Sequence, residues 1–450
     1  MLKYFFASCL AMLLAQAFPA DAQEGDPREQ HLMAIERMIG QKGEASLRSF
    51  AEAHLTNEFR EATGEEALYQ LLASIREQCA GFGGVMVNPT SDGLLMKLML
   101  DGRSVSLSIA TDASADHRIS NLEVSDVEVK PELSPISWEN IDDRLAEESW
   151  FNGSVLAVRD GAISHLGNYG MADRKRSIPL NDDTIYAMGS TPIDFTHIAI
   201  LTLVDRKKLR FEDPISKFFS HAPADKAEIT VRQLMKGESG LQNFHDRPSD
   251  ANTDLSWIDR ATALKRIFEG DLLFEPGTAR EHSHSAWGLL AAIIEEVSGQ
   301  SYGDYLETQL FKPLGMEHTG LYSVARNADP DRVAIGYSGH GVGKINSPAH
   351  WGKTSWLVMG SGGMVSTPMD MYRWMRGCAS TQILSPEMRD QYYGRGGGMA
   401  IAGNERGFFT SYRLDPENFF VVCTNVHNEE DQMIGLTRAL MGLFPQGDDD

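Results

Sequence analysis

The chain has 450 residues, of which 42% are hydrophobic, enough to build more than one buried core. Acidic side chains outnumber basic ones, and the formal net charge at pH 7 is −22. A charge of this sign disfavours nucleic acids and anionic membrane surfaces as partners, so we expect neither.

The N-terminal residues have the features of a secretion signal. Lys3 precedes a short apolar run, and Ala20-Asp21-Ala22 fits the small-x-small pattern of a cleavage site. The apolar run is shorter than the roughly 20 residues that a membrane span needs. We therefore predict a signal peptide at residues 1–22, a mature chain that begins at Gln23, no membrane span, and export to a periplasm or the medium.

Residues 24–130 combine a helical pattern with a strand pattern. From Gln30 to Cys79, apolar side chains recur three and four positions apart. The shorter runs that follow alternate in polarity between turn residues. This order predicts a small α+β domain with helices packed on one curved sheet. The segment carries no catalytic motif, so spacing, docking or dimerisation is the expected role, and substrate capture is an alternative.

Residues 131–137 contain proline and little periodicity, which is typical of a linker. The following block, 138–445, alternates strands, helices and glycine-rich loops. A hairpin turn is predicted at Asp160-Gly161, and a final helix from Glu430 to Leu443.

The cysteines define neither a disulfide framework nor a metal site. Cys9 is lost with the signal peptide, and the other three have no metal-ligand spacing. Buried thiols are the simplest interpretation, and a Cys378–Cys423 disulfide is the alternative. We expect no cofactor.

A serine lies at the start of an apolar helix predicted after Tyr186. Free N–H groups and the helix dipole favour negative charge at this end of a helix, which suits a nucleophile. Gly189 permits a tight entry, and Pro192 falls in the first turn, where a missing N–H costs little. Ser190 is therefore a candidate nucleophile. The alternative is that it only caps the helix.

Five segments, in this order, resemble the serine hydrolases related to class C β-lactamases and penicillin-binding proteins. The resemblance covers roughly Trp138 to Leu443. It implies an α/β (α+β) fold in which an antiparallel sheet is flanked by helices, with a helical subdomain. It also implies that Ser190 attacks the carbonyl group of an ester or peptide. The segments are Ile185–Phe219, Ile229–Phe244, Phe274–Gly320, Gly360–Met375 and Asn418–Asn425.

Two of the family's catalytic motifs are altered. The lysine of Ser-x-x-Lys, which helps to remove the hydroxyl proton in the family, is replaced by Ile193. The Tyr-x-Asn motif is replaced by His282-Ser283-His284. Isoleucine cannot exchange a proton, whereas a histidine with a pKa near 6.5 can act as a base. His282 and His284 are therefore the candidate catalytic partners of Ser190.

The third motif of the family is Lys-Thr-Gly or His-x-Gly, on the strand beside the serine. Its best match here is Arg395-Gly396-Gly397, predicted as a binding element whose guanidinium would hold a ligand carboxylate. Asp194, four residues after Ser190, is an alternative base if burial raises its pKa.

His282 and His284 are also an alternative metal site, joined by His245 and Asp246 from the preceding loop. A lone His-x-His motif is unspecific, so we favour polar side chains lining a cleft, and we expect no metal.

The sequence therefore predicts an exported protein with a degenerate serine hydrolase site. Its cleft would bind a small-molecule carbonyl or peptide-like ligand without efficient hydrolysis, because positioned acids and bases supply much of the rate. One alternative is an active esterase or amidase that forms an acyl-enzyme on Ser190 with His282 or His284 as base. A second alternative is a non-catalytic interaction protein that acts through residues 24–130.

Overall fold

The computed structural model describes residues 27–444 except 41–43, 81–83, 90–92, 101–102, 113–116, 130–135, 149, 246–249, 251–252, 338–344, 394–398, 404–405, 414, 416 and 427–429. The expected signal peptide, most of the expected linker and Arg395-Gly396-Gly397 lie outside the described residues. The chain divides into two compact units, Met1–Glu132 and Leu133–Asp450.

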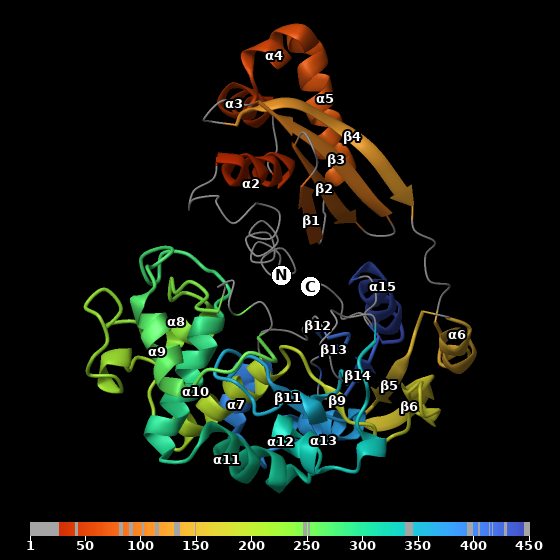
Figure 1. Ribbon diagram of the computed structural model, residues 1–450, viewed down its shortest axis with the longest axis vertical. Coiled ribbons are helices and arrows are strands. Elements are labelled where there is room, and N and C mark those ends of the chain that lie inside the picture. Colours follow the sequence, from red (N-terminus) through yellow and green to blue (C-terminus); the bar gives the residue numbers. More distant parts are fainter. Residues whose placement is uncertain are drawn as a thin grey trace. The chain divides into compact units, whose positions relative to one another are not determined.

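The described residues of the first unit form four helices followed by an antiparallel sheet with strand order β1-β2-β3-β4 (Figure 1). Alternate residues of β2, Leu94, Met96 and Leu98, are buried in the same apolar core as the helices. This period of two explains why one face of the sheet carries the helices. The elements are α2 Pro27–Gly40, α3 Glu44–His54, α4 Asn57–Thr63, α5 Glu65–Cys79, β1 Gly84–Pro89, β2 Gly93–Leu100, β3 Arg103–Thr111 and β4 Ile119–Val129.

The second unit is built on an antiparallel sheet with strand order β12-β13-β14-β5-β6 (Figure 1). Its strands are β5 Gly153–Arg159, β6 Ala162–Tyr169, β12 Met399–Gly403, β13 Phe409–Arg413 and β14 Phe419–Thr424. The hairpin between β5 and β6 turns at Asp160 and Gly161, both with positive φ, as the sequence predicts.

Helices cover both faces of this sheet. Val421 of β14 belongs to the large core that includes α7 (Pro192–Asp205) and α13 (Pro368–Ala379). The next residue, Val422, belongs to the core formed with α6 (Ile141–Glu147) and α15 (Glu430–Met441). The further helices are α8 Val231–Lys236, α9 Arg260–Glu269, α10 His284–Ser298, α11 Tyr302–Leu306, α12 Tyr322–Asn327 and α14 Pro386–Tyr393. The predicted fold class is confirmed.

A small sheet brings distant parts of the chain together below the candidate site. It pairs β10 (Gly320–Leu321), β11 (Met364–Ser366) and β9 (Tyr186–Ala187) in that order. The Met188 N–H donates to the Met364 carbonyl at 3.0 Å and extends this pairing by one residue. A separate pair, β7 Met171–Asp173 with β8 Ile178–Pro179, completes the strands of the described residues.

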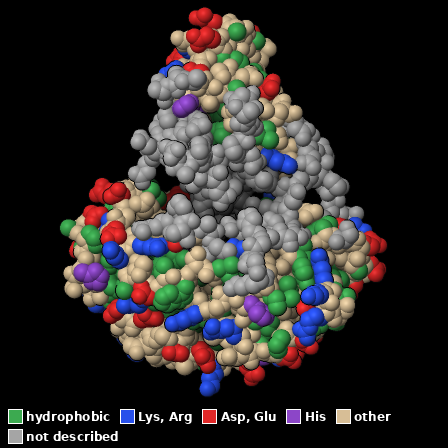
Figure 2. All heavy atoms as spheres, viewed as in Figure 1, with side chains coloured by type: hydrophobic (Ala, Val, Ile, Leu, Met, Phe, Trp, Pro, Cys, Tyr) green, Lys and Arg blue, Asp and Glu red, His purple; other side chains and the backbone are tan. Residues whose placement is uncertain are grey.

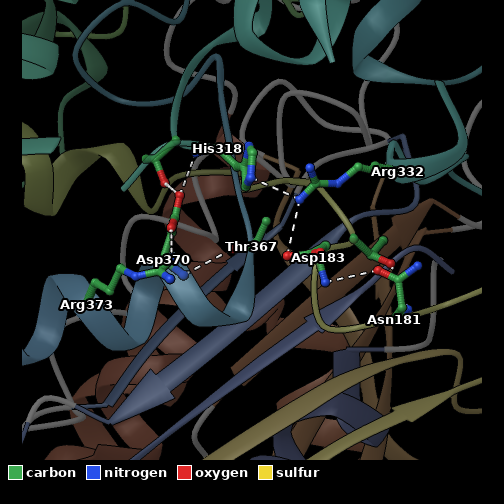
Figure 3. Close-up of polar contacts among 9 residues, drawn as sticks. Asn181, Asp183, His318, Arg332, Thr367, Asp370 and Arg373 are labelled. Carbon is green, nitrogen blue, oxygen red and sulfur yellow. Dashed lines mark hydrogen bonds and ion pairs between the residues drawn. The ribbon is translucent and has the colours of Figure 1, made fainter. Parts of the chain in front are cut away.

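A buried carboxylate fixes the small sheet to α13 (Figure 3). Asp370 accepts hydrogen bonds from the His318 N–H at 2.8 Å and the Thr319 hydroxyl at 2.9 Å, and it pairs with Arg373 at 2.6 Å. Thr319 in turn contacts the Ser366 hydroxyl at 2.8 Å. The ends of β10 and β11 are therefore held to the start of one helix.

Cys79, Cys378 and Cys423 are buried free thiols. The alternative of a Cys378–Cys423 disulfide is thus not what the structure contains.

Candidate functional site

Ser190 lies directly between β9 and α7, at the end of the small sheet. The N-cap position of α7 is Thr191, whose side chain makes no capping hydrogen bond, so Ser190 does not act as the cap. Ser190 is partly exposed, and its hydroxyl makes no hydrogen bond within the part of the chain that the structure describes. The serine is therefore partly open to solvent at a helix start, and none of the described residues accepts a hydrogen bond from its hydroxyl.

Three backbone segments meet at the residue before this serine. Gly189 has a φ of 52°, and a Cβ added there would lie 2.7 Å from both the N and O atoms of Gly403 in β12. A Cβ added to Gly362 would lie 3.2 Å from the Gly189 carbonyl oxygen. Only glycine combines a positive φ with such close backbone approach. The serine turn, β12 and the loop before β11 are therefore in direct contact.

Buried hydrogen bonds also connect the loop before β11 to α7. Thr196 lies one turn into the helix, and its buried hydroxyl contacts the Gly360 carbonyl at 2.6 Å and the Tyr302 hydroxyl at 2.6 Å. The position of residues 360–363 relative to Ser190 is thus set by buried polar contacts.

The sequence comparison expects the family's lysine at position 193, which is isoleucine in this chain. Ile193 packs against the large core of the second unit, in the first turn of α7. Asp194, the alternative base, accepts a hydrogen bond from the Tyr412 hydroxyl of β13. Burial raises the pKa of Asp194 to about 6, and the Tyr412 hydrogen bond partly offsets this rise. The structure thus gives Asp194 a partner in the sheet, and its use as a base stays a prediction.

The substituted Tyr-x-Asn segment forms a histidine cluster at the start of α10. The ring centroid of His284 lies 4.6 Å from that of His245 and 5.0 Å from that of His282. His284 Nδ1 lies 2.9 Å from the Ser361 hydroxyl, and its backbone N–H donates to Asn243 at 2.8 Å. The nearest hydroxyl partner of this imidazole is therefore Ser361, the residue before Gly362, and not Ser190.

Two histidines of the cluster, His282 and His284, lie where burial disfavours the charged form of the ring. Burial lowers the pKa of His282, and the neighbouring His245 lowers it further. Burial also holds the pKa of His284 well below its usual range, with further contributions from His245 and His282. Each imidazolium would be poorly solvated and would face other imidazoles. Among the described residues, no group of three or more His, Cys, Asp or Glu is placed to hold a metal ion.

The third family motif, matched in the sequence by Arg395-Gly396-Gly397, cannot be located in the described part of the structure. Arg395, Gly396 and Gly397 lie outside the described residues, so their binding role stays a prediction. The strand segment that the structure places against Gly189 ends at Gly403, and the residue two positions before this glycine is Ile401. A Lys-x-Gly or His-x-Gly pattern is absent at that place.

Sequence analysis missed Ser361 and the contact of Gly403 with Gly189. The glycine-rich run from Gly360 to Gly363 was a usable signal, because such runs mark close backbone approach. The Gly403 contact depends on the pairing of Gly403 with Phe409 in the sheet, which a single sequence does not reveal.

The fold and this serine turn define the class of the protein. The sequence profile of the Beta-lactamase family matches residues 139–419. The chain belongs to this family of serine hydrolases and their relatives, and the resemblance found in the sequence is confirmed. No helix of the described residues has the length and apolar character needed to cross a bilayer.

Named relatives include penicillin-binding proteins and hydrolases. Penicillin-binding protein 4* of Bacillus subtilis is 28% identical over 265 residues, covering 55% of this chain and 57% of the relative. Teichoic acid D-alanine hydrolase of Staphylococcus aureus is 26% identical over 298 residues, covering 64% of this chain and 70% of the relative. The chain thus spans little more than half the length of the Bacillus subtilis relative.

Solved structures share the fold. FmtA of Staphylococcus aureus has a TM-score of 0.56 at 22% identity, covering 67% of this chain and 88% of FmtA. D-amino acid amidase of Ochrobactrum anthropi has a TM-score of 0.52 at 19% identity, covering 68% of this chain and 97% of the amidase. At such identities the similarity establishes the fold alone.

Proposed function

We propose that this protein is a ligand-binding member of the family whose serine hydrolase site is catalytically impaired. Its cleft would take a small carbonyl compound or a peptide-like ligand, the kind of compound suggested by the relatives' names. The observation that carries the proposal is the Ser190 hydroxyl, which lies at a helix start with no hydrogen-bonded acceptor among the described residues.

The size of the expected loss follows from the missing groups. A positioned general acid or base contributes on the order of 10²–10⁴-fold to a rate. Ile193 and the histidine segment replace both proton-transfer residues of the family. Because such groups act as a unit, their losses do not simply add, but most of the acceleration should be gone.

Restoring the family's residues tests this proposal. We expect the natural protein and Ser190→Ala to hydrolyse p-nitrophenyl acetate within about tenfold of one another, because positioned groups supply most of the rate. The triple variant Ile193→Lys, His282→Tyr, His284→Asn should be at least about 10²-fold faster, and adding Ser190→Ala to it should remove the gain. Rapid labelling of the natural protein at Ser190 by a fluorophosphonate, with turnover to match, would refute the proposal.

The second candidate is a working esterase or amidase with an imidazole base. The contact that favours it is His284 with Ser361, because the next residue, Gly362, lies against Gly189. This candidate predicts ester hydrolysis that is lost in both Ser190→Ala and His284→Gln and that titrates below the ordinary pKa of histidine, because burial lowers the pKa of His284. Hydrolysis that survives in Ser190→Ala excludes it.

We further propose that the protein acts outside the cytoplasm, supported by the signal-like sequence that ends at Ala22. N-terminal sequencing of the protein from its native host should give Gln23 as the first residue. A start at Met1 in the mature protein would contradict export through this signal.

A further inference from the structure

The histidine cluster is the most unusual feature of the cleft. His245, His282 and His284 lie with neighbouring ring centroids 4.6 and 5.0 Å apart, and each is partly exposed to solvent. They lie where the family has the Tyr-x-Asn motif, beside the loop of Ser361 and Gly362. The cluster is therefore joined to the Ser190 turn through this loop, because Ser361 contacts His284 and Gly362 lies against Gly189.

The cluster also coincides with the positive end of a helix. His284 is the first residue of α10, which has 15 residues, and Ser283 is its N-cap. The dipole of a helix of this length favours an anion at its N-terminus and opposes a bound proton there. The grouped imidazoles and the helix N-terminus at which they lie thus favour an anionic group over a cation.

We propose that the histidine cluster is the carboxylate-binding element of the cleft and that it takes up a proton when a ligand carboxylate binds. This inference rests on the proposed ligand-binding function and names the ligand class, a small carboxylic acid of the N-acyl amino acid type. The carboxylate would accept hydrogen bonds from the imidazoles, and its negative charge would stabilise the proton that the cluster takes up.

The groups around His284 determine whether affinity for a carboxylate rises or falls with pH. The groups that act on His284 are His245 and His282, its hydrogen-bond partner is Ser361, and Asp246 lies outside the described residues. In the free protein, burial and these neighbours keep the pKa of His284 below its ordinary value. A bound carboxylate raises the pKa of His284. At pH values between the pKa of the free protein and that of the complex, affinity for the carboxylate should rise as the pH falls, approaching tenfold per pH unit.

Calorimetry on the full chain tests the proposal with a matched pair of probes. N-acetyl-D-alanine carries the carboxylate, and N-acetyl-D-alaninamide is its uncharged counterpart. Titrations run at pH 6 and pH 7, in two buffers of different ionisation enthalpy, with EDTA present throughout. We expect the acid to bind at least tenfold more tightly than the amide at pH 6, with uptake of about one proton per ligand.

Variants assign the effect to the cluster. His284→Gln and His282→Gln should each reduce proton uptake and weaken acid binding by at least tenfold, while amide binding changes less than about twofold. The control is His221→Gln, an exposed histidine of the same unit that contacts Phe219 and Phe268, and it should leave both measurements unchanged.

The outcomes separate this inference from the proposed function. Equal binding of acid and amide, or acid binding without proton uptake, overturns the carboxylate role and leaves ligand binding intact. Acid binding that persists with proton uptake in both histidine variants also overturns it. Absence of binding by both probes overturns it as well, while the hydrolysis comparison still decides the catalytic proposal.

Discussion

At the scale of single residues, the turn at Ser190 is shaped by three glycines from different parts of the chain. Gly189, Gly362 and Gly403 let three backbone segments touch beside Ser190, so the frame of a nucleophile turn is present. The side chains that would move protons are the ones that differ, and Ile193 is the clearest case because a hydrocarbon has no exchangeable proton. The backbone contacts that position Ser190 are thus separate from the side chains that would transfer protons.

Substitution of Gly189 tests the close backbone contact between Gly189 and Gly403. We expect Gly189→Ala to destabilise the second unit by more than Gly299→Ala. Both positions have positive φ, of 52° and 71°, and this strain costs alanine about 1–2 kcal/mol. A Cβ at position 299 meets nothing within 4 Å, whereas at 189 it meets the Gly403 backbone. This steric clash should lower the free energy of unfolding of Gly189→Ala by about 1–3 kcal/mol more than that of Gly299→Ala, as measured by urea denaturation. Equal losses would contradict this contact.

At the scale of elements, α7 is joined to the sheet by a buried polar pair. Asp194 and Tyr412 are adjacent in space although 218 residues separate them in the sequence. The raised pKa of Asp194 means that the folded protein binds a proton more tightly than the unfolded chain. The sign follows directly: this group costs stability as the pH rises from about 4 to about 6.

Asp194→Asn should remove that cost. Relative to the natural protein, we expect the variant to gain stability between pH 4 and pH 6.5, by up to about 3 kcal/mol, since one pKa unit corresponds to about 1.4 kcal/mol. Urea denaturation followed by tryptophan fluorescence at the two pH values measures the difference. A stability difference that does not change with pH would show that Asp194 does not titrate in this range.

The carboxylate below the small sheet gives a second prediction at this scale (Figure 3). Asp370→Ala leaves the His318 N–H and the Thr319 hydroxyl without their acceptor, and unsatisfied buried groups cost about 1–3 kcal/mol each. We expect a loss of about 2–5 kcal/mol. The control, Glu212→Ala, breaks an exposed pair with Arg232 and should cost less than about 1 kcal/mol. Similar unfolding midpoints for the two variants would contradict the role of Asp370 in holding the small sheet to α13.

At the scale of the whole molecule, the two units have separate apolar cores. All seven tryptophans lie in the second unit, so their fluorescence reports on that unit alone. On the face of the second unit shown in Figure 2, acidic and basic side chains are interspersed rather than gathered into one basic patch.

The first unit contains its own pH-sensitive contact. His31 Nδ1 and His54 Nδ1 lie 2.9 Å apart, so one nitrogen must carry the proton and the other must accept it. Burial, together with His31, Arg37 and Arg118, lowers the pKa of His54 to about 4. The folded unit therefore binds fewer protons than the unfolded chain between pH 4 and 6.5, and loses stability as the pH falls through this window.

His54→Asn should reduce this acid sensitivity, because an amide can replace the hydrogen bond and does not titrate. We expect the natural protein to lose up to about 3 kcal/mol relative to the variant between pH 6.5 and pH 4. The change should appear in far-ultraviolet circular dichroism of the full chain and not in tryptophan fluorescence. A parallel shift in both signals would assign the acid sensitivity elsewhere.

The sequence alone determined the family and the fold class, and it placed Ser190 at the start of a helix. These depend on local features, such as the period of apolar residues, glycine at tight turns, and motifs whose parts lie within a few residues of one another. It also determined that position 193 has no proton to exchange, because this is a property of the side chain itself.

Only the tertiary structure decided which partners these residues have. His284 meets Ser361 across 77 positions, and Gly189 meets Gly403 across an even longer separation. Such contacts depend on strand register and on how helices pack on the sheet. Because a shift of one residue in register turns every side chain to the opposite face, no local pattern can specify them.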